Sequence, residues 1–355
     1  RYWDPLKDSK SLKLKNHEEY KKMFLDIYKE AVNCRLRTCG EVGIMVSGGL
    51  DSGSVAAIAT KTLKEQNKVL KGYTFVPLAS YKNKMVGGRI ADESDFVEML
   101  KNHCGNLEVE YCRTDGINSM TDMDEYINTA EQPIKTIENS YWISEIIKKA
   151  SADNVKILLT GQNGNVTISF GDFFVHMQTL LSKGKFIEVI KEVNAANKRY
   201  GKSRKEIYRY ILQDSIPYSI KKIRHRKIIN LKNRIKYGVV RYDLAEKHDV
   251  ERRLEEKDYN STIVRGNTLK GIRKHILDEA VMSQVAILET KNSLKDGIIK
   301  RDPTKDKRVV EFCLSAPSEV FVKEGEERYL IRSAMKGYLP EEIRTNWKKR
   351  GRQSA

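Results

Sequence analysis

Residues 47–52, with the sequence Ser-Gly-Gly-Leu-Asp-Ser, combine glycines, hydroxyls and one carboxylate in a pattern suited to binding phosphate. The preceding run Val42–Val46 is short and apolar, as expected of a parallel strand that is buried on both faces. Gly48 and Gly49 allow positive φ angles and a close approach of the backbone to a ligand. The free N–H groups of a helix that begins after them suit a phosphate or pyrophosphate. The pattern therefore predicts a phosphate-binding turn between a strand and a helix.

Asp51 adds a negative charge to this turn. A carboxylate repels phosphate unless a cation lies between them, and Mg²⁺ prefers carboxylate and phosphate oxygens as ligands. Asp51 is therefore the first candidate Mg²⁺ ligand, and either Asp51 or Ser52 is expected to cap the helix. The alternative is an ordinary glycine-containing turn in which Asp51 serves only as the cap. The sequence has no G-x-x-x-x-G-K-[ST] motif, which disfavours a Walker-type kinase or NTPase.

The composition is that of a globular protein with a polar surface, since 40% of the 355 residues are hydrophobic and 32% are charged. No apolar stretch reaches the length of a membrane span and no signal peptide opens the chain, so no membrane association is expected. The five cysteines are an odd number without the spacing of metal ligands, and they indicate reduced thiols in a cytoplasmic protein. Because the chain begins with Arg rather than Met, we expect a fragment of a longer protein.

Much of the net charge of +17 lies between residues 202 and 236, where Glu206 and Asp214 oppose many lysines and arginines. Such a basic stretch can bind nucleic acid, face solvent along a helix, or dock an acidic peptide or partner domain. We favour the solvated helical face and do not expect a nucleic-acid partner.

Alternating strands and helices predict an α/β fold with a doubly wound, mostly parallel sheet. The strands expected after the first are Val69–Val76, Leu107–Cys112 and Val155–Leu159. In such sheets, ligands bind beyond the carboxyl ends of the strands. The loops that meet this criterion are 47–52, 76–94 and 160–171.

The sequence divides into three parts. Residues 1–40 are expected to form a linker and a leading helix, and residues 41–172 the nucleotide-binding core. Residues 173–355 predict a basic, largely helical part of the same domain, with no further strand. Within this part, the pattern of residues 268–295 predicts a long amphipathic helix.

Several ordered segments resemble the motifs of one family. They are Ser47–Ser52, Tyr73–Val76 with Asp92–Ser94, Leu158–Asn165, Arg301–Phe312, Leu330–Ala334 with Leu339–Arg344, and Lys348–Gly351. On these segments the chain resembles the synthetase domain of the asparagine synthetase family, which includes β-lactam synthetases and lasso-peptide cyclases. The resemblance covers residues 1–351. It implies the fold of the PP-loop ATP pyrophosphatases, which is adenine nucleotide α-hydrolase-like.

The resemblance also implies a reaction. A ligase of this kind uses ATP and Mg²⁺ to activate a carboxylate as an acyl-adenylate, releases pyrophosphate, and transfers ammonia or an amine to the acyl carbon. The residues implied to bind ATP are Ser47, Gly48, Gly49, Leu50, Asp51, Ser52, Phe75, Val76, Gly161 and Gly164. The backbone near Phe75 and Val76 is expected to hold the adenine. Lys349 is the candidate that stabilises pyrophosphate or the acyl transition state, with Lys348 as the alternative, and Asp51 and Gln162 complete the catalytic candidates.

Two residues depart from the family pattern, which offers acids in the loop after Gly161. Gln162 and Asn165 replace them, and Asn165 stands where an aspartate ligand of Mg²⁺ is expected. An amide oxygen coordinates Mg²⁺ without a charge, so the metal affinity is expected to be lower. The glutaminase half of the family, with its catalytic cysteine, is not visible in this chain, and an upstream glutaminase domain is the expected partner.

The leading interpretation is an AMP-forming amide ligase of the asparagine synthase type that acts on aspartate or a related acid. The first alternative is a lasso-peptide or β-lactam type of cyclase, or a specialised amide synthetase, with a peptide or specialised metabolite as substrate. A PP-loop tRNA-modifying enzyme would use the basic stretch but leaves the motifs from Arg301 to Arg344 unexplained. A domain that binds ATP without turnover is a fourth interpretation.

Overall fold

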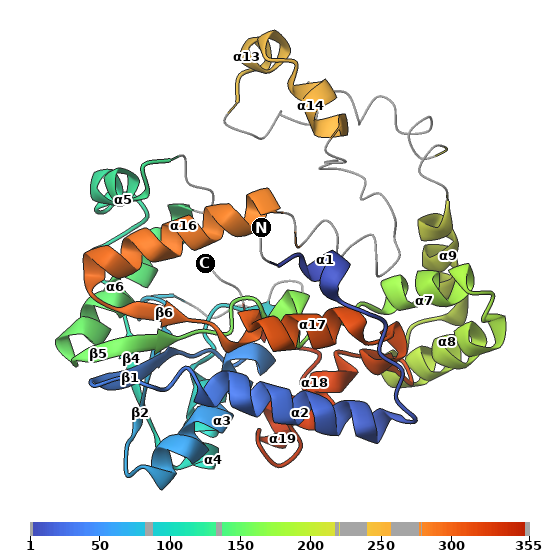
Figure 1. Ribbon diagram of the computed structural model, residues 1–355, viewed down its shortest axis with the longest axis horizontal. Coiled ribbons are helices and arrows are strands. Elements are labelled where there is room, and N and C mark those ends of the chain that lie inside the picture. The colour runs from blue at the N-terminus through green and yellow to red at the C-terminus, as the bar shows by residue number, and fades with distance from the viewer. Residues whose placement is uncertain are drawn as a thin grey trace. The chain divides into compact units, whose positions relative to one another are not determined.

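The computed structural model describes residues 3–81, 88–132, 137–216, 220, 240–256, 277 and 279–351. The chain divides into two compact units, whose helices and strands are labelled in Figure 1. The sheet unit consists of Arg1–Phe170, Glu279–Pro317 and Leu330–Ala355, and the helical unit consists of Gly171–Asp278 and Ser318–Tyr329. The division into residues 1–40, 41–172 and 173–355 stays a prediction.

The sheet unit contains a five-stranded parallel sheet in the order β4-β2-β1-β5-β6. Its strands are β1 (Glu41–Met45), β2 (Leu70–Phe75), β4 (Leu107–Cys112), β5 (Val155–Leu159) and β6 (Ile299–Arg301). Ile44 of the central strand pairs with Gly72 on one side and with Leu159 on the other. The strand order therefore reverses between β1 and β5, and in parallel sheets ligands bind at such a reversal. The sheet confirms the predicted fold class.

Helices connect and cover these strands. α3 (Leu50–Glu65) joins β1 to β2, α4 (Ser94–Cys104) leads into β4, and α6 (Ser140–Ala152) leads into β5. Ile146 and Ala150 of α6 pack in one buried cluster with Tyr73 and Leu158 of the sheet. The remaining elements here are α1 (Pro5–Asp8), α2 (His17–Asn33), β3 (Arg89–Ile90), α5 (Met123–Ala130), η1 (Ile137–Asn139), η2 (Gly164–Val166), α16 (Glu279–Asp296), η3 (Pro303–Lys305), α17 (Lys307–Ser315), α18 (Tyr329–Ala334), α19 (Glu341–Arg344) and β9 (Arg350–Gly351).

The leading helix α2 has an apolar stripe at helical spacing. Tyr20, Phe24 and Tyr28 follow one another at intervals of four residues and are all buried. The ring of Phe24 stacks on that of Tyr28 at 5.3 Å and lies 5.7 Å from Phe312 of α17. This stripe confirms the leading helix and fixes it against a distant part of the chain.

The helical unit contains three consecutive helices and a short hairpin. They are α7 (Phe173–Ser182), α8 (Phe186–Tyr200), α9 (Arg204–Ser215), η4 (Ser318–Val320), β7 (Val322–Lys323) and β8 (Glu326–Glu327), with α13 (Tyr242–Lys247) and α14 (Val250–Glu256) following α9. Met177, Val193 and Ile211 belong to the buried cluster that joins the three helices, and Val322 of the hairpin packs in the same cluster.

The prediction that no strand follows residue 173 was wrong. β6 (Ile299–Arg301) adds an edge strand to the parallel sheet, and the chain forms further short strands at β7, β8 and β9. β6 has only three residues, two of them basic, so it carries none of the apolar run by which a strand is recognised. Of the helix predicted over 268–295, the structure contains α16 (Glu279–Asp296), and Leu277 lies in a turn; residues 268–276 and 278 lie outside the described residues. Most of the basic stretch 202–236 also lies outside them.

Within the described ranges, the helices are all too short or too polar to cross a membrane. All five cysteines lie in these ranges and are free thiols.

Candidate active site

The predicted phosphate-binding turn lies between β1 and the start of α3. The helix begins at Leu50, two or three residues earlier than a cap at Asp51 or Ser52 would place it, and its cap residue is Gly49, which has no side chain. The prediction that Asp51 or Ser52 caps the helix was therefore wrong. The hydroxyl of Ser52 instead accepts a hydrogen bond from the amide of Ser47 at 3.1 Å and lies 3.0 Å from the Ser47 hydroxyl. A helix start without a side-chain cap leaves the N–H groups of its first turn available for an anion.

The two glycines of the turn serve close packing rather than a left-handed backbone. Gly49 has a φ of −87°, and neither glycine is among the residues with positive φ, so that part of the prediction was wrong. A Cβ atom on Gly48 would lie 2.5 Å from the Cβ of Phe96 and 3.1 Å from Oε1 of Glu93. Glycine is needed at residue 48 because α4 packs directly on the turn, while the close approach of this backbone to a ligand stays a prediction.

The loop after β5 closes on Asp51. A Cβ atom on Gly164 would lie 2.3 Å from Cγ of Asp51, and one on Gly161 would lie 2.7 Å from the amide nitrogen of Ser52. Only glycine fits at these two positions without displacing the helix start. The structure thus brings together two loops that are more than a hundred residues apart in the sequence, at the reversal of strand order. Gln162 and Asn165 of this loop are exposed.

Asp302, which follows β6, anchors this loop. Its buried carboxylate accepts hydrogen bonds from the amide of Asn163 at 2.9 Å and from the amide of Thr304 at 2.8 Å. Burial raises the pKa of Asp302, and the hydrogen bonds from Thr304 and Asn163 oppose that shift. The amide of Thr160 also donates to the carbonyl of Arg301 at 3.0 Å. This role of Asp302 was not predicted, because Asn163 is 139 residues away in the chain.

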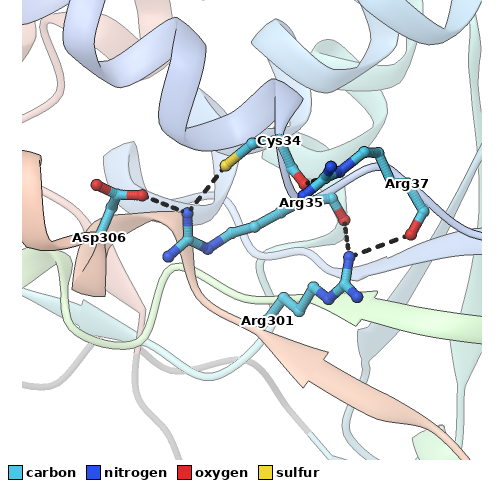
Figure 2. Close-up of a pocket in the computed structure, with 5 residues that line it drawn as sticks. All are labelled: Cys34, Arg35, Arg37, Arg301 and Asp306. Atoms are coloured by element: carbon cyan, nitrogen blue, oxygen red, sulfur yellow. Dashed lines mark hydrogen bonds and ion pairs between the residues drawn. The ribbon is translucent and has the colours of Figure 1, made fainter.

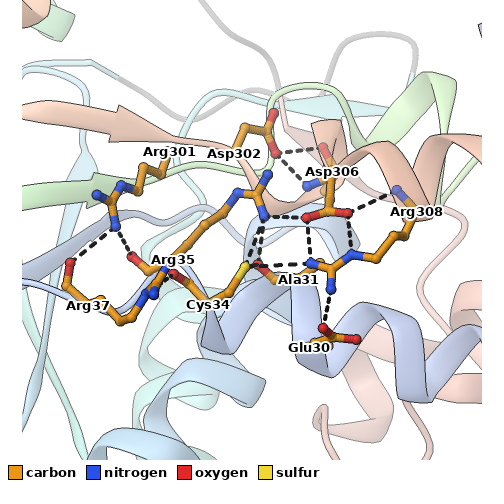
Figure 3. Close-up of polar contacts among 10 residues, drawn as sticks. Glu30, Ala31, Cys34, Arg35, Arg37, Arg301, Asp302, Asp306 and Arg308 are labelled. Atoms are coloured by element: carbon orange, nitrogen blue, oxygen red, sulfur yellow. Dashed lines mark hydrogen bonds and ion pairs between the residues drawn. The ribbon is translucent and has the colours of Figure 1, made fainter. Parts of the chain in front are cut away.

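The sheet unit also contains a cavity of about 630 Å³, lined by Cys34, Arg35, Arg37, Arg301 and Asp306 (Figure 2). The guanidinium of Arg301 donates to the carbonyls of Arg35 and Arg37 at 3.0 and 3.2 Å. Asp306 accepts from Arg35 at 2.6 Å and from Arg308 at 2.9 Å (Figure 3). These contacts tie the segment between α2 and β1 to the segment after β6. The residues that line the cavity hold these two segments together, and none of them belongs to the turn 47–52.

Glu93 is a partly buried carboxylate beside the turn, and its place in the site was not predicted. Its carboxylate accepts a hydrogen bond from the amide of Gly48. Burial raises the pKa of Glu93 to about 7, the charge of Asp92 adds to this effect, and the bond from Gly48 opposes it. Asp92 accepts from the amide of Ser94 at 3.0 Å at the start of α4. The Asp-Glu-Ser motif was the available signal, but it does not reveal burial.

Phe75 and Val76 lie at the carboxyl end of β2. The half-buried ring of Phe75 packs against Trp142 at 5.7 Å and Tyr141 at 6.3 Å. The amide of Val76 donates to the carbonyl of Cys112 at 3.0 Å. This N–H is therefore engaged in the sheet, and the binding of adenine near Phe75 and Val76 stays a prediction.

Lys349 lies in the exposed segment that leads to β9. Its amide donates to Oδ1 of Asn346 at 3.0 Å. The neighbouring Lys348 has its ammonium 5.3 Å from the ring centroid of Trp347, a cation–π contact. Both lysines are exposed, so Lys349 stays the candidate and Lys348 the alternative.

The residues around the turn fit Mg²⁺ as a partly hydrated ion. Asp51 offers one carboxylate at the helix start, held against Gly164, and the exposed amide of Asn165 lies on the same loop as Gly164. In the part of the chain that the structure describes, no group of three or more His, Cys, Asp and Glu residues could hold a metal ion. Mg²⁺ commonly binds through one or two protein oxygens together with waters and substrate phosphates, so this sparse donor set matches it.

Comparison with known proteins adds the family. The asparagine synthase family model matches residues 23–354 of this chain. The chain belongs to the asparagine synthase family. Membership confirms the resemblance drawn from the ordered motifs, and it shows an ATP pyrophosphatase type of synthetase domain over most of the chain.

A search of curated proteins finds no match for this asparagine synthase domain. Among solved structures, it is similar to the NH3-dependent NAD synthetase of Campylobacter jejuni subsp. jejuni NCTC 11168, determined in complex with the nitrate ion. The match has 13% sequence identity and a TM-score of 0.26, and it covers 80% of this chain and 97% of the other. A TM-score this low carries no argument about function.

Proposed function

We propose that this chain is an ATP-dependent, AMP-forming amide ligase. It adenylates a carboxylate of aspartate or a related acid, releases pyrophosphate, and transfers ammonia or an amine to the acyl group. The observation that carries the proposal is the contact of Asp51 with Gly164 at the start of α3, which joins a phosphate-binding turn to the loop after β5. ATP is a substrate in this reaction.

The start of α3 is the group that binds phosphate in this proposal. The N–H groups of its first turn and the positive end of the helix dipole lie where negative charge accumulates as the bond between the α- and β-phosphates breaks. The hydroxyls of Ser47 and Ser52 lie 3.0 Å apart and either can donate to the other, so the pair adds one further donor for phosphate. Preorganised donors of this kind act without reorganisation when the charge develops.

Asp51 and Asn165 are the residues that would hold Mg²⁺. When bound, the ion supplies charge neutralisation to the phosphate oxygens. Gly161 and Gly164 position Asp51 by excluding any side chain between the two loops. Lys349 adds a mobile positive charge for the leaving pyrophosphate, and the backbone near Phe75 and Val76 holds the adenine.

The acid substrate is the least constrained part of the proposal. Gln162 and Asn165 are neutral and exposed, where the family pattern has acids, so this loop repels an acidic substrate less than its relatives do. This observation supports the second candidate function, a lasso-peptide or β-lactam type of cyclase or a specialised amide synthetase that acts on a peptide or specialised metabolite. We further propose a glutaminase domain upstream as the ammonia source and a cytoplasmic setting, which the free thiols support.

Exchange of labelled pyrophosphate into ATP tests this proposal. The reaction is run with Mg²⁺ and aspartate, and then with a panel of other acids and peptides. Exchange that depends on aspartate supports the first function, and exchange only with another acid supports the second. Asp51→Asn is the control for the site: it keeps the shape of the side chain, removes the charge, and is expected to lower the exchange rate about 100-fold or more. No exchange with any acid would overturn the proposed function.

A further inference from the structure

Arg332 is a buried arginine that holds the backbone of the C-terminal segment 344–351. It lies in α18, with 6% of its surface exposed. One end of its guanidinium donates to the carbonyl of Arg344, and the other donates to the carbonyl of Asn346 at 2.9 Å. Arg344 donates in return to the carbonyl of Arg332 at 3.1 Å. The planar fork of an arginine can bridge two carbonyls in this way, and a lysine cannot reproduce both contacts.

Asn346 links the backbone held by Arg332 to the backbone of Lys349. Its Oδ1 accepts from the amide of Lys349 at 3.0 Å, and its Nδ2 donates to the carbonyl of Lys349 at 2.6 Å. The same asparagine therefore fixes both backbone groups of Lys349, while its own carbonyl is held by Arg332. The backbone of Lys349 is thus held by hydrogen bonds that run from Arg332 to Asn346 and from Asn346 to Lys349, while the side chain of Lys349 is exposed.

The end of the segment reaches the residues beside the phosphate-binding turn. Arg350 and Gly351 of β9 pair in parallel with Arg89 and Ile90 of β3. A Cβ atom on Gly351 would lie 2.0 Å from Oε2 of Glu93, and this carboxylate also accepts the amide of Gly48. The side chain of Glu93 therefore lies between Gly351 at the end of the segment and Gly48 of the phosphate-binding turn.

We infer that Arg332 is a positioning residue that holds Lys349 beside the phosphate-binding turn through Asn346. Releasing the segment would strip a buried guanidinium of two carbonyl partners, which is costly, so the contact couples the order of the segment to the fold of the sheet unit. The inference deepens the proposed function and rests on it for the consequence to turnover. The placement of the segment itself does not depend on what reaction the site performs.

The test compares Arg332→Ala, Arg332→Lys and Asn346→Ala in the full chain. Backbone hydrogen exchange, followed by mass spectrometry, reports on peptides that cover 345–351 and on peptides of β1. We expect Arg332→Ala and Asn346→Ala to speed exchange in 345–351 about tenfold or more without changing β1, because only the segment loses its anchor. In the pyrophosphate exchange assay, both variants are expected to lower kcat up to about tenfold, the loss expected on removing the Lys349 side chain itself, and to leave the KM for ATP nearly unchanged. Arg332→Lys should recover part of both losses.

Arg199→Ala is the matched control, since it removes an arginine that pairs with Glu326 at 3.4 Å within the helical unit. It is expected to change neither the exchange of 345–351 nor kcat. If Arg332→Ala does not fold, Asn346→Ala carries the test, because it removes the second link at the surface. Unchanged exchange in 345–351 overturns the anchoring role, and faster exchange with an unchanged kcat overturns the positioning role. If the wild-type chain turns over no acid, the proposed function fails, while hydrogen exchange still decides whether Arg332 anchors the segment.

Discussion

Replacing Gly164 by alanine should disable the site while leaving the fold in place. The new Cβ would lie 2.3 Å from Cγ and 2.5 Å from Oδ1 of Asp51, against about 3.5 Å for an ordinary contact, so the carboxylate or the loop must move by about 1 Å. A displacement of that size in a positioning group lowers turnover about 100-fold. The overpacking itself costs about 1–3 kcal/mol of stability. Asp51 is thus expected to lose its function before the protein loses its structure.

The assay is pyrophosphate exchange at saturating ATP, together with the thermal unfolding midpoint. Gly105→Ala is the control, because this residue ends α4 at a φ of 65° in open space, so alanine there adds backbone strain without touching the site. Strain of this kind costs about 1–2 kcal/mol. The control should lower the midpoint by a similar amount and keep its activity. If Gly164→Ala retains wild-type turnover, the placement of Asp51 by the two loops is not what the reaction depends on.

Three further predictions follow from charges in the sheet unit. Burial raises the pKa of Asp306, but hydrogen bonds from Arg308 and Arg35 outweigh it and hold this pKa well below its usual range. The stability that results is present above about pH 4 and is lost as the pH falls further. Asp306→Asn should therefore cost about 2 kcal/mol of unfolding free energy at pH 7, and unfolding in urea at a series of pH values should show a smaller loss of stability in acid. Glu93 has a pKa raised from 4.5 to about 7, so the folded state binds more protons and stability falls as the pH rises through this window; Glu93→Gln should remove that fall, and an unchanged pH profile would contradict it. Lys349→Ala should lower kcat about tenfold with little effect on the KM for ATP, and equal activity would show that Lys349 is only a surface residue.

The parts of the site that depend on local pattern were predictable from the sequence. The apolar run before Ser47, the glycines after it and the charge of Asp51 specify a turn between a strand and a helix, and the structure contains it at the expected place. The glycines after β5 were also identified, because the run Val155–Leu159 has the length and composition of a buried strand.

The parts that depend on tertiary contacts were not predictable. β6 is an edge strand of Ile-Lys-Arg, whose pairing with β5 comes from the sheet and not from its own residues. The burial of Glu93 and the two carbonyl contacts of Arg332 join residues that local sequence keeps apart. The wrong prediction of the cap of α3 has a similar cause. Polar residues are the usual caps, but here the hydroxyl of Ser52 accepts a hydrogen bond from the amide of Ser47, and Gly49 occupies the cap position.

The most direct test of the central claim follows the oxygen atoms of the acid. An acid that supports pyrophosphate exchange is labelled with ¹⁸O in its carboxylate, and the nucleotide product is analysed by mass spectrometry after one turnover with ammonia or an amine. Attack of a carboxylate on the α-phosphate, at the turn whose Asp51 packs against Gly164, transfers one labelled oxygen to AMP. We therefore predict AMP that carries a single ¹⁸O, together with unlabelled pyrophosphate. Unlabelled AMP, or ADP and phosphate as products, would contradict the account.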